Sequence, residues 1–169
     1  MTVAVRRAMP EDVSIVHDML LEAARWVDAL GVVMWEQGEL ELERLRSEVA
    51  AGSFFIAFIG NDAAGAVKFQ LDDLLFWPDL PQTDSAFVHR LVVRRSYAGR
   101  GVSTALLAWA VERTRQLGKS WLRLDCDADR PKLRALYEQF GFTFHSFRQV
   151  GPYYVARYEY RLVPTEERR

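Results

Sequence analysis

The glycine turn Gly99-Arg100-Gly101 is the stretch whose residue types point most directly to chemistry. Apolar residues before it and at 105–107 after it predict a strand leading into the turn and a helix leading out. The first N–H groups of a helix have no partner within the helix, and they lie at the positive end of its dipole. The turn therefore predicts a seat for a phosphate group, and we expect a phosphorylated cofactor.

Two other reactive side chains lie on the strands predicted beside this turn. His89 is the only residue of its strand whose unperturbed pKa lies near neutrality, although a lone histidine in an apolar strand more often packs in the core. Cys126 is the single cysteine of the chain, so an internal disulfide framework and a multi-cysteine metal site are excluded. We expect no metal, and we favour a buried structural role for Cys126 over a nucleophilic one.

The turn must be positioned by a strand–helix–strand unit, which requires parallel strands with a right-handed crossover. Apolar periodicity and turn residues predict the following elements of the C-terminal half: strand 86–93, helix 102–117, strand 121–126, helix 131–140 with Gly141 as its left-handed stop, and strands 142–150 and 153–162. The N-terminal half is predicted to contain strand 3–8, a helix ending at Gly31, helix 38–50, hairpin strands 53–59 and 64–71, and a loop at 72–83.

Length and composition favour a single domain that spans residues 1–163, followed by a polar tail at 164–169, and two very small domains are the alternative. The chain has 169 residues, half of them hydrophobic, and a formal net charge of −1. This charge balance gives no field for nucleic acid or an anionic membrane, and no apolar run is long enough to span a bilayer. We expect a soluble, cytoplasmic protein.

The C-terminal half resembles the GCN5-related N-acetyltransferase (GNAT) family. The resemblance rests on strand 89–93, the glycine turn, the pair Leu106-Leu107 and the segment 136–142, which reads Leu-Tyr-Glu-Gln-Phe-Gly-Phe. It implies an α/β fold of the α+β type, the acyl-CoA N-acyltransferase fold. In this fold a mixed, mostly antiparallel sheet is flanked by helices, and its central parallel strand pair splays apart.

The resemblance implies acetyl transfer from acetyl-CoA, as co-substrate, to a primary amine by direct transfer in a ternary complex. The acceptor is then a small-molecule amine or a peptide. The residues it assigns to the cofactor are Leu91, Val92 and Val93 on the strand, Ala98, Gly99, Arg100, Gly101, Val102, Ser103 and Thr104 at the turn, and Arg130. Arg94, Arg95 and Arg100 either neutralise phosphates or form a solvated rim.

Three positions depart from the family pattern. Ala98 opens the turn where arginine or glutamine is usual, and Ser103 closes it where glycine or alanine is usual. Arg130 stands at about the place of a frequent asparagine. Backbone amides do most of the phosphate binding in such a loop, so these departures put cofactor affinity in doubt more than the fold.

Catalysis of this reaction needs a proton for the departing thiolate and a base for the amine. The resemblance places Tyr137 as the acid, and its ring is also in phase to pack in the core. The family's strand glutamate is absent here, which leaves His89 as the base. Asp84, Asp125 and Asp127 are weaker candidates, and an ordered water chain, which needs no dedicated side chain, is a further alternative.

By analogy with the family, the acceptor pocket is expected to be built by the first two helices and the irregular loop. The acceptor is expected to be an amine with an apolar or aromatic body that contacts a wall of Trp35, Phe76 and Trp77, for which core packing is the alternative. Acidic residues expected either to attract a protonated amine or to form solvated faces are Glu36, Asp72, Asp73 and Asp79. The aromatic residues of the last two strands suit either a homodimer interface or alternate burial in a sheet. Two other functions remain open: a non-catalytic acyl-CoA sensor or assembly module, and a protein or peptide N-terminal acetyltransferase.

Overall fold

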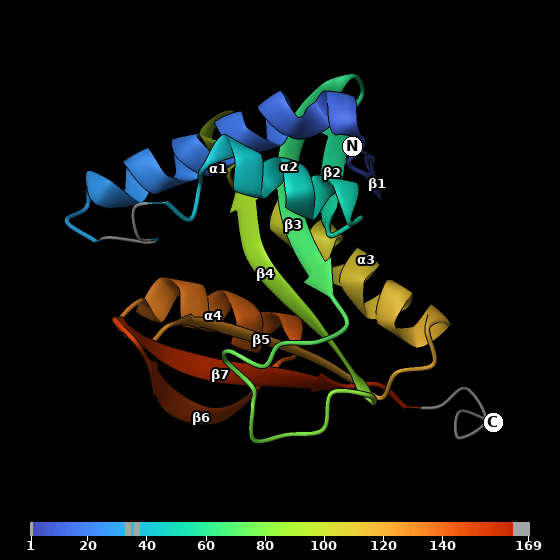
Figure 1. Cartoon of the computed structure of the whole chain (residues 1–169), viewed down its shortest axis with the longest axis vertical. Helices are drawn as coiled ribbons and strands as arrows, with labels where there is room; N and C mark the ends of the chain where they lie inside the picture. The colour runs from blue at the N-terminus through green and yellow to red at the C-terminus, as the bar shows by residue number, and fades with distance from the viewer. Residues whose placement is uncertain (1, 33–34, 36–37, 164–169) are drawn as a thin grey trace. The chain divides into compact units, whose positions relative to one another are not determined.

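A computed structural model describes residues 2–32, 35 and 38–163 of the chain (Figure 1). In these residues seven strands form one sheet in the order β1-β2-β3-β4-β5-β7-β6. The strands are β1 (Val3–Arg7), β2 (Phe54–Ile59), β3 (Asp62–Gln70), β4 (Ser85–Val93), β5 (Trp121–Asp127), β6 (Thr143–Val150) and β7 (Tyr153–Arg161). The helices are α1 (Val13–Asp28), α2 (Leu42–Ala50), α3 (Val102–Gln116) and α4 (Pro131–Phe140), with short 3₁₀ turns η1 (Pro10–Asp12) and η2 (Arg95–Tyr97).

The strand pairing is mixed and mostly antiparallel, which confirms the predicted fold class. Strands β1 with β2, β2 with β3, β5 with β7 and β6 with β7 run antiparallel. Strands β4 and β5 run parallel, from Ser85 beside Trp121 to Val88 beside Leu124. A parallel pair needs a crossover connection, and α3 supplies it.

The chain divides into two compact units. The first comprises the described residues up to Phe69 together with Arg90–Leu107, and the second comprises Gln70–His89 together with the described residues from Ala108 onward. Strand β4 and helix α3 therefore each contribute to both units.

The first unit has its own hydrophobic core, in which α1 and α2 pack on the strands. Helix α1 has a buried face because its apolar residues recur at helical spacing. The core cluster consists of Ala8, Val13, Val16, Met19, Leu20, Leu45, Val49, Phe54, Ile56, Ala66 and Val92. Helix α2 begins at Leu42, so the prediction of a start at residue 38 was wrong. Gly38 has a φ of 98° and Glu41 is extended, and neither conformation can belong to a right-handed helix.

In the second unit, the loop between β3 and β4 is fastened to the sheet by Arg157 of β7. This guanidinium is buried, with a side chain 4% exposed, and it forms a two-pronged ion pair with Asp79 at 2.7 and 3.0 Å. Its Nη1 also donates to the carbonyl oxygen of Phe76 at 3.1 Å, and its Nε donates to Oγ of Ser146 on β6 at 2.9 Å. The hydrogen bonds from Arg157 lower the pKa of Asp79 to about 2. Thus one side chain joins the loop to β6 and β7.

A second set of hydrogen bonds closes this loop on itself. The N–H of Asp73 donates to Oε1 of Gln82 at 2.6 Å, and Nε2 of Gln82 donates to the carbonyl oxygen of Trp77 at 2.7 Å. The Trp77 side chain is fully buried beneath the loop, against Phe87. The predicted irregular loop is therefore an ordered structure with a small core of its own.

The predicted tail at residues 164–169 lies outside the described residues, as does Glu36. Within the described part of the chain, each helix is too short or too polar to cross a membrane.

We predict that Asp79→Asn destabilises the protein by about 2 kcal/mol at pH 7. The Asp79 side chain is 42% exposed, so solvent screening limits the ion pair itself to about 1 kcal/mol, and the rest arises because Arg157 stays buried without its counter-charge. A carboxylate with a lowered pKa contributes stability above its unfolded pKa of about 4 and loses it as the pH falls. Denaturant unfolding should therefore show the two proteins converging between about pH 4 and pH 2, and a constant difference would contradict this role for Asp79.

Candidate active site

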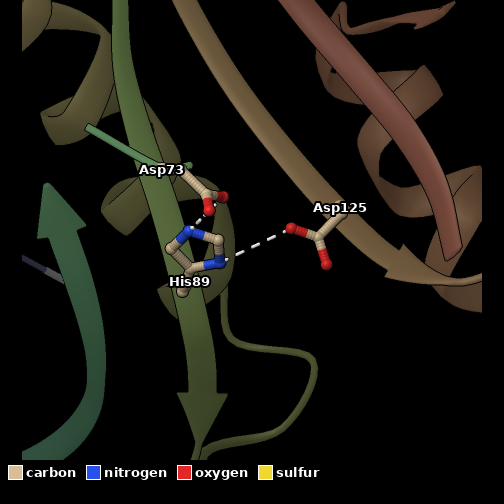
Figure 2. Close-up of side chains that lie close together, drawn as sticks. All are labelled: Asp73, His89 and Asp125. Carbon is tan, nitrogen blue, oxygen red and sulfur yellow. Dashed lines mark ion pairs between the residues drawn. The ribbon is translucent and has the colours of Figure 1, made fainter. Parts of the chain in front are cut away.

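A buried cluster of His89, Asp73 and Asp125 is the main group of reactive side chains in the second unit (Figure 2). His89 lies on β4 just after Val88, the last residue of the parallel pairing, and Asp125 lies on the neighbouring strand β5. Asp73 comes from the fastened loop. Nε2 of His89 lies 2.9 Å from Oδ2 of Asp73, and Nδ1 lies 3.5 Å from Oδ1 of Asp125.

The three side chains are only 6–16% exposed, so their charges interact in a poorly solvated setting. Oδ2 of Asp73 and Oδ1 of Asp125 accept no hydrogen bond from another described residue, which leaves His89 as the group that faces both oxygens. Figure 2 shows the imidazole between the two carboxylates. A positive charge on the ring is therefore stabilised from two sides.

The two carboxylates respond to this setting in opposite directions. Burial acts to raise the pKa of Asp73, but hydrogen bonding and charge attraction from His89, together with backbone N–H donors at Phe76 and Leu75, lower its pKa overall. Burial raises the pKa of Asp125 to about 6, although the charge of His89 acts to lower it. Asp73 is thus a fixed anion, whereas Asp125 titrates near neutral pH.

The two carboxylates face different nitrogens of the ring, and this arrangement suits proton transfer. A proton on Nε2 directed at Asp73 leaves Nδ1 with a lone pair and Asp125 next to it. One ligand atom from each of Asp73, His89 and Asp125 also lies within 4.8 Å of the other two, so the same three side chains are close enough to hold a cation.

Aromatic rings line the same part of the second unit. The Phe76 ring lies 6.0 Å from the His89 ring between centroids, and the Tyr153 ring lies 6.3 Å from that of Phe76. Trp77, expected at the acceptor, is fully buried against Phe87, His145 and Arg157. This burial favours its packing role.

Tyr137 and Cys126 are buried together in the second unit, on α4 and β5. The Tyr137 ring packs edge-on against Phe142, 6.0 Å away between centroids, and burial raises the pKa of its hydroxyl. The Tyr137 hydroxyl therefore keeps its proton at neutral pH and has it available to donate. Burial also raises the pKa of the Cys126 thiol to about 12, which disfavours a nucleophilic role. Arg130 is the N-cap residue of α4.

The glycine turn lies in the first unit and has the backbone that the sequence predicts. Gly99 and Gly101 have φ values of 75° and 79°, which only glycine adopts readily, and α3 begins at Val102. The N–H groups of Ala98 and Arg100 already donate to Arg95 and Tyr97. The predicted phosphate seat therefore has its amides at Gly99 and from Gly101 onward.

The arginines beside the turn have other contacts. Arg94 forms ion pairs of 2.9 Å with both Asp18 and Glu22 on α1. The guanidinium of Arg95 lies 3.9 Å from the ring centroid of Trp26, and that of Arg100 lies 5.4 Å from the ring centroid of Tyr97. Sequence reasoning did not anticipate that Arg94 holds the turn to α1, because nothing local to either segment signals that pairing.

The backbone of β4 has an unusual conformation at the residue after His89. Arg90 has a φ of 51°, the only positive value at a non-glycine among the described residues, and such strain is concentrated at functional sites. Its guanidinium donates to the carbonyl oxygen of Glu39 at 3.1 Å and lies 5.5 Å from the ring centroid of Trp35. Trp35 thus lies in the first unit beside the beginning of the strand segment expected to bind cofactor.

Comparison with known proteins agrees with this architecture. A model of the acetyltransferase (GNAT) family matches residues 18–142. A protein of Bacillus subtilis (strain 168) named "Uncharacterized N-acetyltransferase YesJ" is 28% identical over 145 residues, covering 81% of this chain and 79% of that protein.

Two solved structures share the fold. An acetyltransferase of the GNAT family from Listeria monocytogenes 4b F2365 matches with a TM-score of 0.79 and 23% identity, covering 95% of each chain. The yncA protein from Salmonella typhimurium, solved with its cofactor acetyl-CoA, matches with a TM-score of 0.73 and 14% identity, covering 96% of this chain and 95% of that one. The family match confirms the resemblance read from the sequence: this chain belongs to the GNAT family of acetyltransferases and is an acyltransferase.

Proposed function

We propose that the chain transfers an acetyl group from acetyl-CoA to a primary amine by direct attack, as one catalytic domain over residues 1–163. The observation that carries this proposal is the buried imidazole of His89 between two carboxylates. Family membership and the acetyl-CoA in the yncA structure support the choice of acetyl donor. The primary amine is the acceptor that the resemblance to the family implies.

In this proposal the glycine turn binds the pyrophosphate of the cofactor. The amides of Gly99 and of residues 101–104 supply donors at a helix N-terminus, which is a favourable place for an anion. The backbone of Leu91, Val92 and Val93 pairs with the pantetheine arm as an added strand would. Ala98 and Ser103 contribute through their backbones, and Arg130 supplies a positive charge near α4.

The chemical step moves one proton in and one proton out. The neutral amine nitrogen forms a bond to the thioester carbonyl carbon, and the proton that this nitrogen then loses passes to Nδ1 of His89, directly or through water. Asp73 holds the other ring nitrogen and Asp125 stabilises the charge. The carbon–sulfur bond then breaks. Tyr137 donates its phenolic proton to the leaving thiolate, and backbone N–H groups stabilise the oxyanion.

We predict that Gly101→Ala weakens acetyl-CoA binding about five- to tenfold. The new side chain has open space, but its backbone would be strained at a φ of 79°, which costs about 1 kcal/mol. Gly151→Ala, in the turn between β6 and β7, is a matched control with a φ of 54° and equally open space. Calorimetry should show an unchanged dissociation constant for this control. Equal affinities of all three proteins would contradict the assignment of the turn.

We predict that Tyr137→Phe lowers kcat by about a hundredfold or more while leaving the dissociation constant of acetyl-CoA unchanged, because the ring still packs and only the proton donor is lost. Thiol release with a panel of primary amines measures this. Tyr154→Phe, at an exposed residue of β7, is the control. If the native protein binds CoA tightly but acetylates no amine, the non-catalytic sensor replaces the enzyme.

We predict that His89→Gln lowers kcat/KM by about a hundredfold or more. The activity of the native protein should rise with pH as the His89–Asp125 pair loses its proton, because only the deprotonated pair accepts one. In Asp125→Asn the imidazolium loses one stabilising carboxylate, so the rising limb moves to lower pH. Asp129→Asn, at an exposed residue after β5, should leave the limb in place. An unshifted limb in Asp125→Asn would rule out the coupled pair.

A further inference from the structure

We propose that Leu74, Leu75 and Phe76 form the seat for the body of the acceptor, and that the acceptor is a primary amine with an apolar body and no carboxylate. This inference rests on the proposed function and specifies its substrate class. It keeps Phe76 and the apolar body that the sequence leads us to expect, adds Leu74 and Leu75, excludes a carboxylate, and leaves out Trp77, which is fully buried and cannot present its ring.

The loop exposes an unusual amount of apolar side chain. Leu74 is 69% exposed, Leu75 is 64% exposed and Leu71 is 49% exposed, all within five positions of one another. Single exposed leucines are common on protein surfaces and need no explanation, but neighbouring ones beside a reactive group favour a binding role.

These leucines stand on a backbone that is held in place. On one side the N–H of Asp73 donates to Gln82, and on the other Arg157 donates to the carbonyl oxygen of Phe76. The N–H of Phe76 also donates to Oδ1 of Asp73 at 3.0 Å. Because the loop is already ordered before the ligand binds, little entropy is lost in ordering it on binding.

The chain leads directly from the reactive cluster to the exposed leucines. Asp73, whose carboxylate contacts His89, directly precedes Leu74, and the Phe76 ring lies 6.0 Å from the imidazole between centroids. The Tyr153 ring lies 6.3 Å from that of Phe76 and adds a further aromatic side chain. In the proposal, an amine whose nitrogen lies at His89 has its carbon chain over Phe76 and the leucines.

The charges around the seat select against a carboxylate on the acceptor. Asp72 is exposed beside it, and Asp73 and Asp125 are buried next to it. Two cations of β6 and β7 lie near the loop, and both face Asp79: Arg157 in a two-pronged contact and Arg148 at 3.9 Å. An ammonium group is thus attracted to this part of the loop, whereas an anionic group is repelled.

The test compares kcat/KM of n-propylamine, n-butylamine, n-pentylamine and n-hexylamine with that of 6-aminohexanoate, which carries the same amine on a chain ending in a carboxylate. We expect kcat/KM of the alkylamines to rise about two- to fourfold per methylene group, as expected for partial to full burial. We expect 6-aminohexanoate to be at least tenfold poorer than n-hexylamine.

The variant Leu74→Ser/Leu75→Ser should flatten the chain-length dependence, lowering kcat/KM of n-hexylamine at least tenfold more than that of n-propylamine. Val163→Ser is the matched control, because it also removes an exposed apolar side chain. Val163 follows Leu162, whose N–H donates to the carbonyl oxygen of Ser120 just before β5. A flat series in the native protein, or a steep series that the double variant retains, would overturn the inference and leave the proposed function intact. Failure to acetylate any amine would instead overturn the proposed function.

Discussion

The second unit depends on how one buried cation, Arg157, is satisfied. A guanidinium that is 4% exposed needs both a counter-charge and hydrogen-bond acceptors, and it obtains them from Asp79, the carbonyl oxygen of Phe76 and Ser146. Two of these partners belong to the loop between β3 and β4. The loop is therefore ordered by an electrostatic requirement of the sheet, although its own sequence contains little regular structure.

This requirement determines what surrounds His89. Because the loop is held at Phe76 and Asp79, its earlier residues bring the carboxylate of Asp73 to Nε2 of the imidazole. Asp125 approaches the other nitrogen from β5, a rigid strand. One carboxylate thus comes from a fastened loop and the other from the sheet, and their pKa values shift in opposite directions because only Asp73 gains enough hydrogen bonds to outweigh burial.

Local features of the chain were predictable from the sequence, whereas contacts between distant segments were not. The turn at Gly99 and Gly101 needs φ values that glycine alone adopts readily, so the residue type reveals the backbone. The periodicity of α4 likewise placed Tyr137 on a buried face. Asp73 was recognised only as an acid near the acceptor, since no local pattern pairs a loop carboxylate with a histidine on a later strand.

The buried thiol of Cys126 bears on the kinetics of the proposed reaction. Because burial raises the pKa of this thiol to about 12, almost none of it is ionised at neutral pH. A thiol held in this state reacts slowly with a thioester, which supports the proposed direct transfer over an acetyl-cysteine intermediate. In direct transfer the donor and the acceptor are bound together before either product leaves, and initial-rate plots then intersect, whereas a ping-pong scheme gives parallel lines.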